Sequence, residues 1–124
     1  MILLLPYPPT INHYYGVRGK ARFIKPAGLE FRRVVAERVA QKSNSMILGK
    51  VAIQIQIVPP DKRKRDIDNV LKALLDSLTK AGVWKDDSQI VDLRIVKYDP
   101  LDGGGTVVNI IDMEQDESAI TMPR

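Results

Sequence analysis

The segment KRKRDIDNVLKALLD, residues 62–76, places side chains of opposite charge directly beside one another. A cluster of cations attracts polyanions, whereas paired carboxylates repel phosphate unless a positive charge lies between them. A divalent metal ion bound by the acids would reconcile the two tendencies. The acids in question are Asp66 and Asp68, and they follow four consecutive basic residues: Lys62, Arg63, Lys64 and Arg65.

A second acidic pair, Asp86 and Asp87, follows in the segment WKDDSQI. If Asp66, Asp68 and one acid of this pair converge, they form a site of hard oxygen ligands, which Mg²⁺ and Mn²⁺ prefer. A metal held in this way can activate water and neutralise charge on a scissile phosphate. The basic run would then hold the flanking phosphates of a nucleic acid. From the pattern alone either acid of the pair is open as the third ligand, and the turn that carries it need not lie near Asp66.

The same residues also fit a purely structural interpretation. Asp66 lies just before a predicted helix, and Asp68 and Asn69 lie in its first turn, where backbone N–H groups and the helix dipole favour negative charge. Asp68 and Lys72, one helical turn apart, could form a surface ion pair. Capping accounts well for one acid and poorly for two, and it leaves Lys72 unexplained.

Two helices and a strand should position these groups. An i, i+3, i+4, i+7 stripe predicts a helix from about residue 68 to Gly82, with these apolar positions: Ile67, Val70, Leu71, Leu74, Leu75 and Leu78. Residues 26–42 show a second amphipathic pattern, with these apolar positions: Leu29, Val34, Val35, Val39 and Ala40. The segment KVAIQIQIVPP alternates with period two and predicts a strand that ends at Pro59.

The remaining segments predict further strands and turns. Residues 2–5 indicate a short buried strand, and the glycines at 16 and 19 favour a hairpin ending in a strand over 21–25. Residues 89–98 and the segment TVVNIIDM are typical of strands, and the LDGGG turn between them suggests that they form a hairpin. We expect Trp84 to fill the core at the helix end, and His13 to be a polar loop residue. Asp76 and Asp92 are expected to be structural.

This order of elements predicts an α+β domain in which two principal helices pack on one mainly antiparallel or mixed sheet. A chain of 124 residues fits one domain, residues 1–124, in which residues 114–124 lack periodicity and form a flexible tail. Cysteine is absent, which excludes disulfides, a thiolate nucleophile and cysteine zinc sites. The apolar run at the N-terminus is too short for a signal peptide or a membrane span, so we expect a cytoplasmic protein with no membrane partner.

The charge balance favours an anionic partner. There are 19 basic and 15 acidic residues, which give a formal net charge of +4. A short chain with several apolar strands and few helices also leaves apolar surface that a second copy would bury, so a homodimer is expected.

Two stretches of the chain resemble the RusA-type Holliday junction resolvases. The segment RKRDIDNVLKALLDSLTKAGVWKDDSQIVD is similar to that family's signature of basic residues, Asp-x-Asp-Asn, a lysine one turn later and an aromatic-x-Asp-Asp turn. The N-terminal LPYPPTINHYY resembles the family's Pro-Pro-x-x-Asn start. The resemblance extends from Leu4 to about Met113.

The resemblance implies a Mg²⁺-dependent endonuclease, with Mn²⁺ able to substitute, that acts as a homodimer and cuts four-way DNA junctions symmetrically in recombination and repair. It implies that the metal-binding acids are Asp66, Asp68 and Asp87, since the second aspartate of the pair is the family's catalytic one. It further implies an essential lysine at Lys72 with Arg65 as the adjacent cation. The expected nucleic-acid contacts are then Lys62, Arg63, Lys64, Arg65 and Asn69.

Two other functions would use the same residues. A basic α+β module could clamp branched or single-stranded nucleic acid without cutting it, with the acids serving as helix caps. A nuclease could also act on flaps or on RNA, because carboxylate–metal chemistry does not specify the shape of the nucleic acid. All of these functions predict salt-sensitive binding, so strand scission in Mg²⁺ is the property that separates the binding module from the nucleases.

Overall fold

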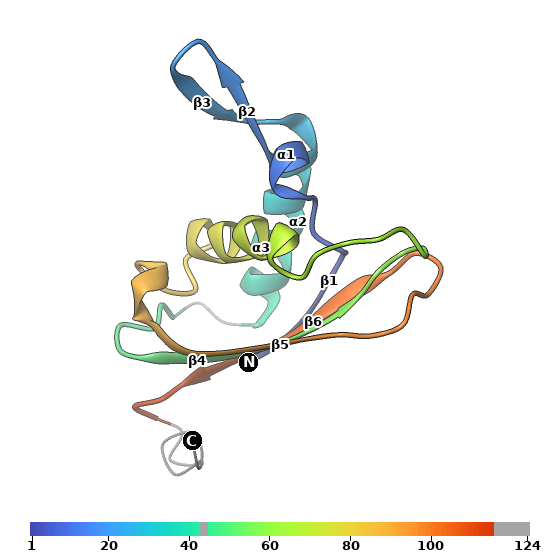
Figure 1. The fold of residues 1–124 in the computed structure, drawn as a ribbon. Coiled ribbons are helices and arrows are strands. Elements are labelled where there is room, and N and C mark those ends of the chain that lie inside the picture. The colour runs from blue at the N-terminus through green and yellow to red at the C-terminus, as the bar shows by residue number, and fades with distance from the viewer. Residues whose placement is uncertain (43–44, 116–124) are drawn as a thin grey trace.

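The computed structural model describes residues 1–42 and 45–115 and has an α+β fold (Figure 1). Most of the predicted tail, residues 116–124, therefore lies outside the described residues. The elements, in chain order, are β1 (Ile2–Leu5), α1 (Ile11–Tyr14), β2 (Tyr15–Arg18), β3 (Ala21–Ile24), α2 (Pro26–Lys42), β4 (Val51–Val58), α3 (Asp68–Lys80), the 3₁₀ turn η1 (Asp87–Gln89), β5 (Ile90–Lys97) and β6 (Gly105–Asp112).

The main sheet is mixed and has the strand order β1-β6-β4-β5. Strand β6 pairs antiparallel with both β1 and β4, whereas β5 pairs parallel with β4. The predicted hairpin between the last two strands is therefore wrong, because β4 lies between β5 and β6. Since α3 carries the chain back to start β5 parallel to β4, β6 occupies the opposite edge of β4. The connection after β5 crosses the end of β4, where the Leu101 N–H donates to the Pro59 carbonyl at 3.0 Å.

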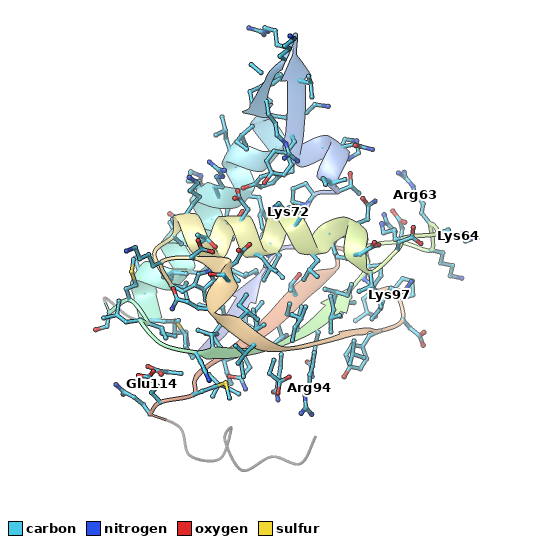
Figure 2. The ribbon with its side chains drawn as sticks, turned by 60° about the vertical axis from the view of Figure 1, so that its left-hand side comes forward. Arg63, Lys64, Lys72, Arg94, Lys97 and Glu114 are labelled. Carbon is cyan, nitrogen blue, oxygen red and sulfur yellow. The ribbon has the colours of Figure 1, made fainter. Side chains whose placement is uncertain are left out.

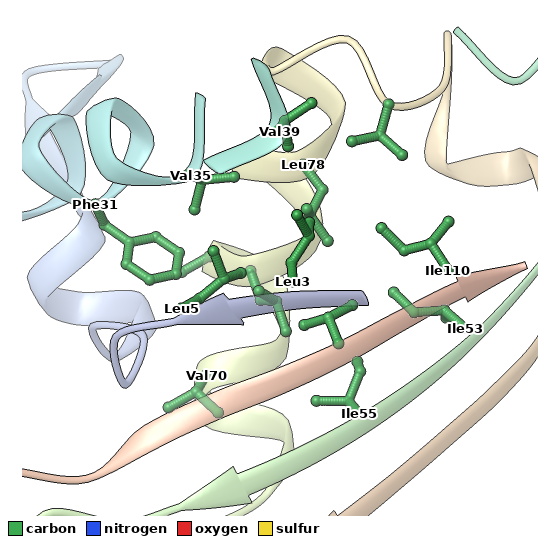
Figure 3. Close-up of a cluster of buried hydrophobic side chains, with 14 of the residues drawn as sticks. Leu3, Leu5, Phe31, Val35, Val39, Ile53, Ile55, Val70, Leu78 and Ile110 are labelled. Atoms are coloured by element: carbon green, nitrogen blue, oxygen red, sulfur yellow. The ribbon is translucent and has the colours of Figure 1, made fainter. Parts of the chain in front are cut away.

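The hydrophobic core lies between α2, α3 and one face of this sheet (Figures 1 and 3). The α3 stripe is confirmed, since Val70, Leu74 and Leu78 are buried. The predicted apolar face of α2 is confirmed at Val35 and Val39 but is wrong at Leu29 and Ala40, which are exposed. Its buried residues are Gly28, Phe31, Val35 and Val39, while Leu29 is 55% exposed. Positions four apart share one helical face, and the aromatic ring at 31 belongs to the stripe that ends at 39.

The opposite face of the sheet carries no helix within the described residues. Strand β1 was expected to be buried, yet it alternates: Leu3 and Leu5 face the core, whereas Ile2 and Leu4 are 55% and 62% exposed. The period-two geometry of a strand sends alternate side chains to opposite faces, and helices cover one of those faces. An exposed apolar surface therefore remains on the outer side of β1.

The predicted N-terminal hairpin is confirmed. Strands β2 and β3 pair antiparallel and form a separate two-stranded sheet, with Tyr15 opposite Ile24 and Arg18 opposite Ala21. The turn between them contains Gly19, whose φ of 63° lies in the left-handed region that glycine adopts without strain. Figure 1 shows this hairpin projecting from the body of the molecule, away from the main sheet.

A half-buried polar network ties the three helices together. The Asp76 carboxylate on α3 accepts hydrogen bonds from Arg32 on α2 at 2.7 Å and from the Tyr14 hydroxyl on α1 at 2.5 Å. The Arg32 Nε donates to the Tyr14 oxygen at 2.6 Å, and Ser77 lies 3.2 Å from that oxygen. Burial alone would raise the pKa of Asp76, but the hydrogen bonds from Tyr14 and Arg32 outweigh it and hold the pKa below its usual range. Asp76 thus has the structural role expected of it.

This network yields a stability prediction with a matched control one residue away. Arg32→Ala leaves the Asp76 carboxylate half-buried without its cation, so we expect a loss of about 1–3 kcal/mol in the free energy of unfolding. Arg33 forms ion pairs with Glu30 and Glu37 on the exposed side of the same helix, and Arg33→Ala should cost much less. Urea denaturation of both variants is the measurement, and equal losses would contradict the structural role of the network.

Candidate active site

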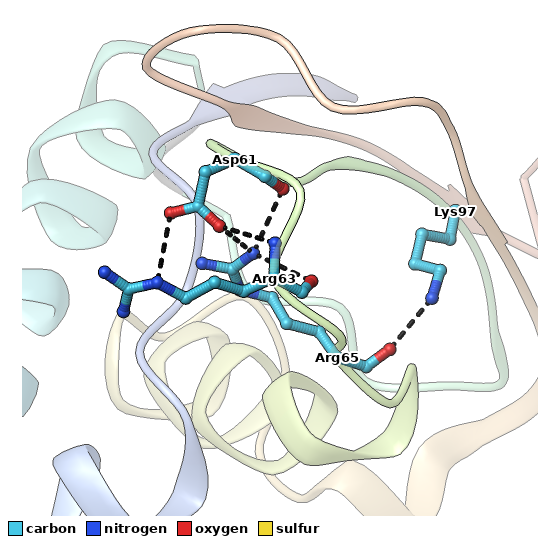
Figure 4. Close-up of polar contacts among 4 residues, drawn as sticks. All are labelled: Asp61, Arg63, Arg65 and Lys97. Atoms are coloured by element: carbon cyan, nitrogen blue, oxygen red, sulfur yellow. Dashed lines mark hydrogen bonds and ion pairs between the residues drawn. The ribbon is translucent and has the colours of Figure 1, made fainter.

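The loop between β4 and α3 is organised around Arg65. Its Nη1 donates to the Asp61 carboxylate at 2.7 Å and to the backbone carbonyls of Asp61 and Arg63 at 3.2 and 3.3 Å (Figure 4). The hydrogen bond from Arg65, together with one from the Arg63 N–H, lowers the pKa of Asp61 to about 2. The Arg65 guanidinium also lies 5.6 Å from the centre of the Tyr7 ring. Of the predicted cations, Arg65 therefore holds the loop in place, and 15% of its side chain is exposed.

The other cations of the basic run face solvent. Lys62, Arg63 and Lys64 are exposed, and Figure 2 shows Arg63, Lys64 and Lys97 at the same end of the molecule, near the start of α3. The Lys97 Nζ donates to the Arg65 carbonyl at 2.8 Å and so joins the end of β5 to this loop. The basic run thus lies beside the C-terminal ends of β4 and β5.

Asp66 and Asp68 lie at the start of α3 with their side chains exposed. The residue at the N-cap position is Ile67, and the helix start has no side-chain cap. The backbone carbonyl of Asp66, and not its carboxylate, accepts the Asn69 N–H at 3.3 Å. Among the described residues, neither carboxylate is in an ion pair, so the alternatives of capping and of an Asp68–Lys72 pair are not formed. Both carboxylates are free to bind a ligand.

A cleft of about 640 Å³ opens at the start of α3 and is lined by Asp66 but not by Asp68. One wall comes from the N-terminal Pro-Pro segment and α1, and the other comes from the basic run and the first turn of α3. The lining residues are Tyr7, Pro8, Pro9, Thr10, His13, Arg63, Lys64, Arg65, Asp66 and Asn69. The two stretches that resemble one family in the sequence therefore meet in space as the two walls of one cleft.

His13 is a residue whose place at this cleft the sequence reasoning missed. It was expected to be a loop residue, but it lies in α1, is exposed, and has its Nδ1 3.0 Å from the Thr10 hydroxyl. The available signal was its position next to the Pro-Pro-x-x-Asn stretch. The side chain has a polar ring at the wall of the cleft, where it can contact a bound ligand.

The turn after α3 separates the roles of the two neighbouring acids. Asp86 accepts the Ser88 N–H at 2.9 Å and forms a capping box with Gln89. The hydrogen bond from the Ser88 N–H lowers the pKa of Asp86. Trp84 is fully buried, as predicted, and donates to the Thr79 hydroxyl at 2.7 Å. Both acids are exposed, but Asp86 caps the turn, while Asp87 lies in its first position.

Asp87 lies at the opposite end of the parallel strands β4 and β5 from Asp66 and Asp68. In a unit of two parallel strands joined by a helix, the helix starts where the first strand ends and returns to where the second strand starts. Asp87 comes just before β5, whereas Lys97 at the other end of β5 contacts Arg65. Eight residues of strand correspond to roughly 20–25 Å. Accordingly, the described residues contain no group of three potential acidic or histidine ligands arranged to hold a metal ion.

Comparison with known proteins identifies relatives along nearly the whole chain. The family model described as endodeoxyribonuclease RusA matches residues 6–111. The chain is 37% identical over 112 residues to the crossover junction endodeoxyribonuclease of Enterobacteria phage HK97, covering 90% of this chain and 93% of that protein. It is 40% identical over 114 residues to the protein of the same name from Enterobacteria phage 82, with the same coverage. The one from Escherichia coli strain K12 is 38% identical over 112 residues.

None of the helices in the described part of the chain has both the length and the apolar character needed to cross a bilayer.

Proposed function

The chain belongs to the RusA endodeoxyribonuclease family, and on that premise we propose that it is a crossover junction endodeoxyribonuclease that cuts four-way DNA junctions. The observation that carries the proposal is the start of α3, where the carboxylate of Asp66 lines a cleft with Arg63 and Lys64, and the exposed carboxylate of Asp68 follows two residues later. Free acids next to cations are what a metal-dependent phosphodiester hydrolysis requires. A module that only binds DNA has no need for such carboxylates.

The donor set at the start of α3 fits a hard divalent cation. Asp66 and Asp68 offer exposed carboxylate oxygens, which suit Mg²⁺, with Mn²⁺ as a substitute. A Mg²⁺ ion bound there would supply an activated water and neutralise charge on the scissile phosphate. Asp87 is proposed as the third acid, because Asp86 is already engaged as the cap of its turn.

Lys72 and the basic run contribute the positive charges. Lys72 is exposed one helical turn after Asp68 (Figure 2), where its ammonium can stabilise charge that develops on the phosphate. Lys62, Arg63 and Lys64 are proposed to hold the flanking phosphates, with Asn69 as a further contact in the cleft. Arg65 is proposed to act at this surface while its bonds to Asp61 keep the loop in one conformation.

We also propose that the active species is a homodimer with composite sites. Asp87 lies too far from Asp66 and Asp68 of its own chain to share a metal with them, so a second copy would supply it. A two-fold dimer also matches a substrate that needs two symmetric cuts. The uncovered sheet face supports association, since Ile2, Leu4 and Val96 are each at least half exposed there. Burying such side chains against a partner is favourable.

The basic test incubates the protein with a labelled four-way junction, a flap and a linear duplex, each in Mg²⁺ or EDTA. We expect paired cuts in the junction in Mg²⁺ and no cutting in EDTA. Equal cutting of all the substrates would remove the junction selectivity, and binding without any scission would favour the non-catalytic module.

The metal-ligand assignment predicts a specific pattern among aspartate variants. Asp68→Asn should reduce Mg²⁺-dependent cleavage by at least about a hundredfold, because it removes one charged ligand. Junction binding should stay intact or become tighter, since repulsion of phosphate decreases. Asp66→Asn and Asp87→Asn should behave alike. Asp86→Asn is the matched control and should be milder, because asparagine can also cap the turn. A severe effect at Asp86 alone would shift the assignment by one residue.

Composite sites predict complementation between inactive variants. When Asp68→Asn and Asp87→Asn chains are unfolded together and refolded, mixed dimers contain one site with all its acids and one site lacking both. Those dimers should nick one strand of the junction in Mg²⁺. A mixture of Asp66→Asn and Asp68→Asn chains leaves every site damaged and should remain inactive. Failure of the first mixture to nick, with mixed dimers verified by mass spectrometry, would rule out composite sites.

The proposed role of Lys72 predicts that its loss lowers the cleavage rate but not the affinity for the junction. Lys72→Ala should slow single-turnover cleavage by about 10²–10³-fold while changing junction affinity little, because its charge acts mainly in the transition state. Lys80→Ala, on the last turn of the same helix, is the control and should leave the rate unchanged. Near-normal turnover by Lys72→Ala would show that Lys72 is an ordinary surface residue.

A further inference from the structure

The β2–β3 hairpin has no part in the site proposed above. Of its residues in the described chain, Tyr15 and Ile24 at its base pack against the core, whereas its outer residues Val17, Arg18 and Lys20 are exposed. A two-stranded ribbon that leaves the body of a small protein buries little apolar surface. Little burial therefore accounts for this ribbon, and the charge of its side chains suggests a role for it.

The base of the hairpin is held firmly to the wall of the cleft. The chain passes directly from α1, which carries His13, into β2. The Lys25 N–H donates to the Tyr14 carbonyl at 2.9 Å, and the Lys25 Nζ donates to the Asn12 carbonyl at 2.8 Å. Tyr14 itself is fully buried in the network with Asp76. The direction in which the hairpin projects is therefore fixed relative to the candidate active site.

The hairpin also carries the excess positive charge of the chain. Residues 15–25 contain no acid, and the first acid in the sequence is Glu30. The cations of this segment are Arg18, Lys20, Arg22 and Lys25. Their number equals the formal net charge of +4, so the rest of the chain is electrically balanced. A projecting element with all the excess charge is suited to a polyanion.

Two arginines of the hairpin lie over its aromatic rings. The Arg22 guanidinium lies 3.8 Å from the centre of the Tyr15 ring, and that of Arg18 lies 5.6 Å from the centre of the Phe23 ring. By the strand register, these two stacks lie on opposite faces of the ribbon. Among the described residues, no hairpin cation is in an ion pair. A guanidinium stacked by its face keeps its N–H edges available for phosphate oxygens.

We propose that the hairpin is a second DNA-contact element, which binds backbone phosphates of the DNA arm leaving the cleft. This inference rests on the proposed function, because it takes DNA as the polyanion. Each strand has four residues, and at about 3.3 Å per residue the ribbon reaches roughly 13 Å, or about four base pairs of duplex. The contact holds the arm in position and adds affinity, while the acids at the start of α3 perform the chemistry.

The test compares two triple variants that lose the same charge. One replaces Arg18, Lys20 and Arg22 with glutamine, and the control replaces the exposed lysines Lys42, Lys50 and Lys80. Binding to a labelled four-way junction is measured in EDTA over a series of salt concentrations. The slope of log K against log salt should fall by about 2–3 in the hairpin variant, because each phosphate contact contributes about 0.9. The control should keep the wild-type slope.

A single substitution controls for the possibility that the triple variant loses binding because it misfolds. Lys20→Gln changes an exposed side chain at the turn and should lower the slope by about one, whereas Lys50→Gln should not. Unchanged slopes in both hairpin variants would overturn the proposal, as would an equal loss in the triple control. Either result would favour an acidic protein surface, in place of DNA, as the partner of the hairpin. Because binding is read in EDTA, a wild-type protein that never cuts DNA in Mg²⁺ would instead overturn the proposed function.

Discussion

The parallel pairing of β5 with β4 is the constraint on which the functional geometry depends. Because β5 runs beside β4 in the same direction, α3 must carry the chain from the end of β4 back to the level where β4 starts. Asp66 and Asp68 then lie where β4 ends, and Asp87 lies where β5 begins. A small fold with a single such crossover cannot gather these acids within one chain, and from this we infer that two copies combine to form each site.

The aspartates divide into two groups with different physical roles. Asp61, Asp76 and Asp86 are hydrogen-bonded to arginines or backbone N–H groups, and these bonds hold their pKa values below the usual range. They stabilise, respectively, the loop before α3, the packing of three helices and the turn before β5. The proposed ligands Asp66, Asp68 and Asp87 are exposed, and none of them is in an ion pair among the described residues. The structural acids fix the backbone on which the free acids are presented, so the free acids need no partners of their own.

The N-terminal segment joins the proposed catalytic site to the proposed DNA contact. Its prolines form one wall of the cleft, α1 carries His13, and the chain then continues into the basic hairpin. Tyr14 lies between these parts and is bonded to Asp76 and Arg32 in the interior. A change in that buried network would therefore move the cleft wall and the hairpin together. Because the four hairpin cations equal the whole net charge, the proposed DNA contact carries its positive charge outside the packed body of the protein.

The sequence by itself determined most of the elements and the residues able to do the chemistry. Period-two and 3.6-residue patterns identified β4 and α3, because a side chain's burial follows its place along a single element. The motif around Asp66 and the turn with Asp87 identified the family, and glycine at 19 identified the hairpin turn. Tertiary structure alone decided that β6 pairs with β4 and not with β5, since strand order depends on which edge remains open after α3 packs. It alone decided that Arg65 organises its loop, that Asp86 rather than Asp87 caps its turn, and that the two Asp clusters lie apart. The strand order and the separation of the Asp clusters are relations between groups remote in the chain, about which local spacing carries no information. The bonds of Arg65 to Asp61 and of Asp86 to Ser88 are local, but the same sequence spacing is compatible with more than one conformation of the loop and of the turn.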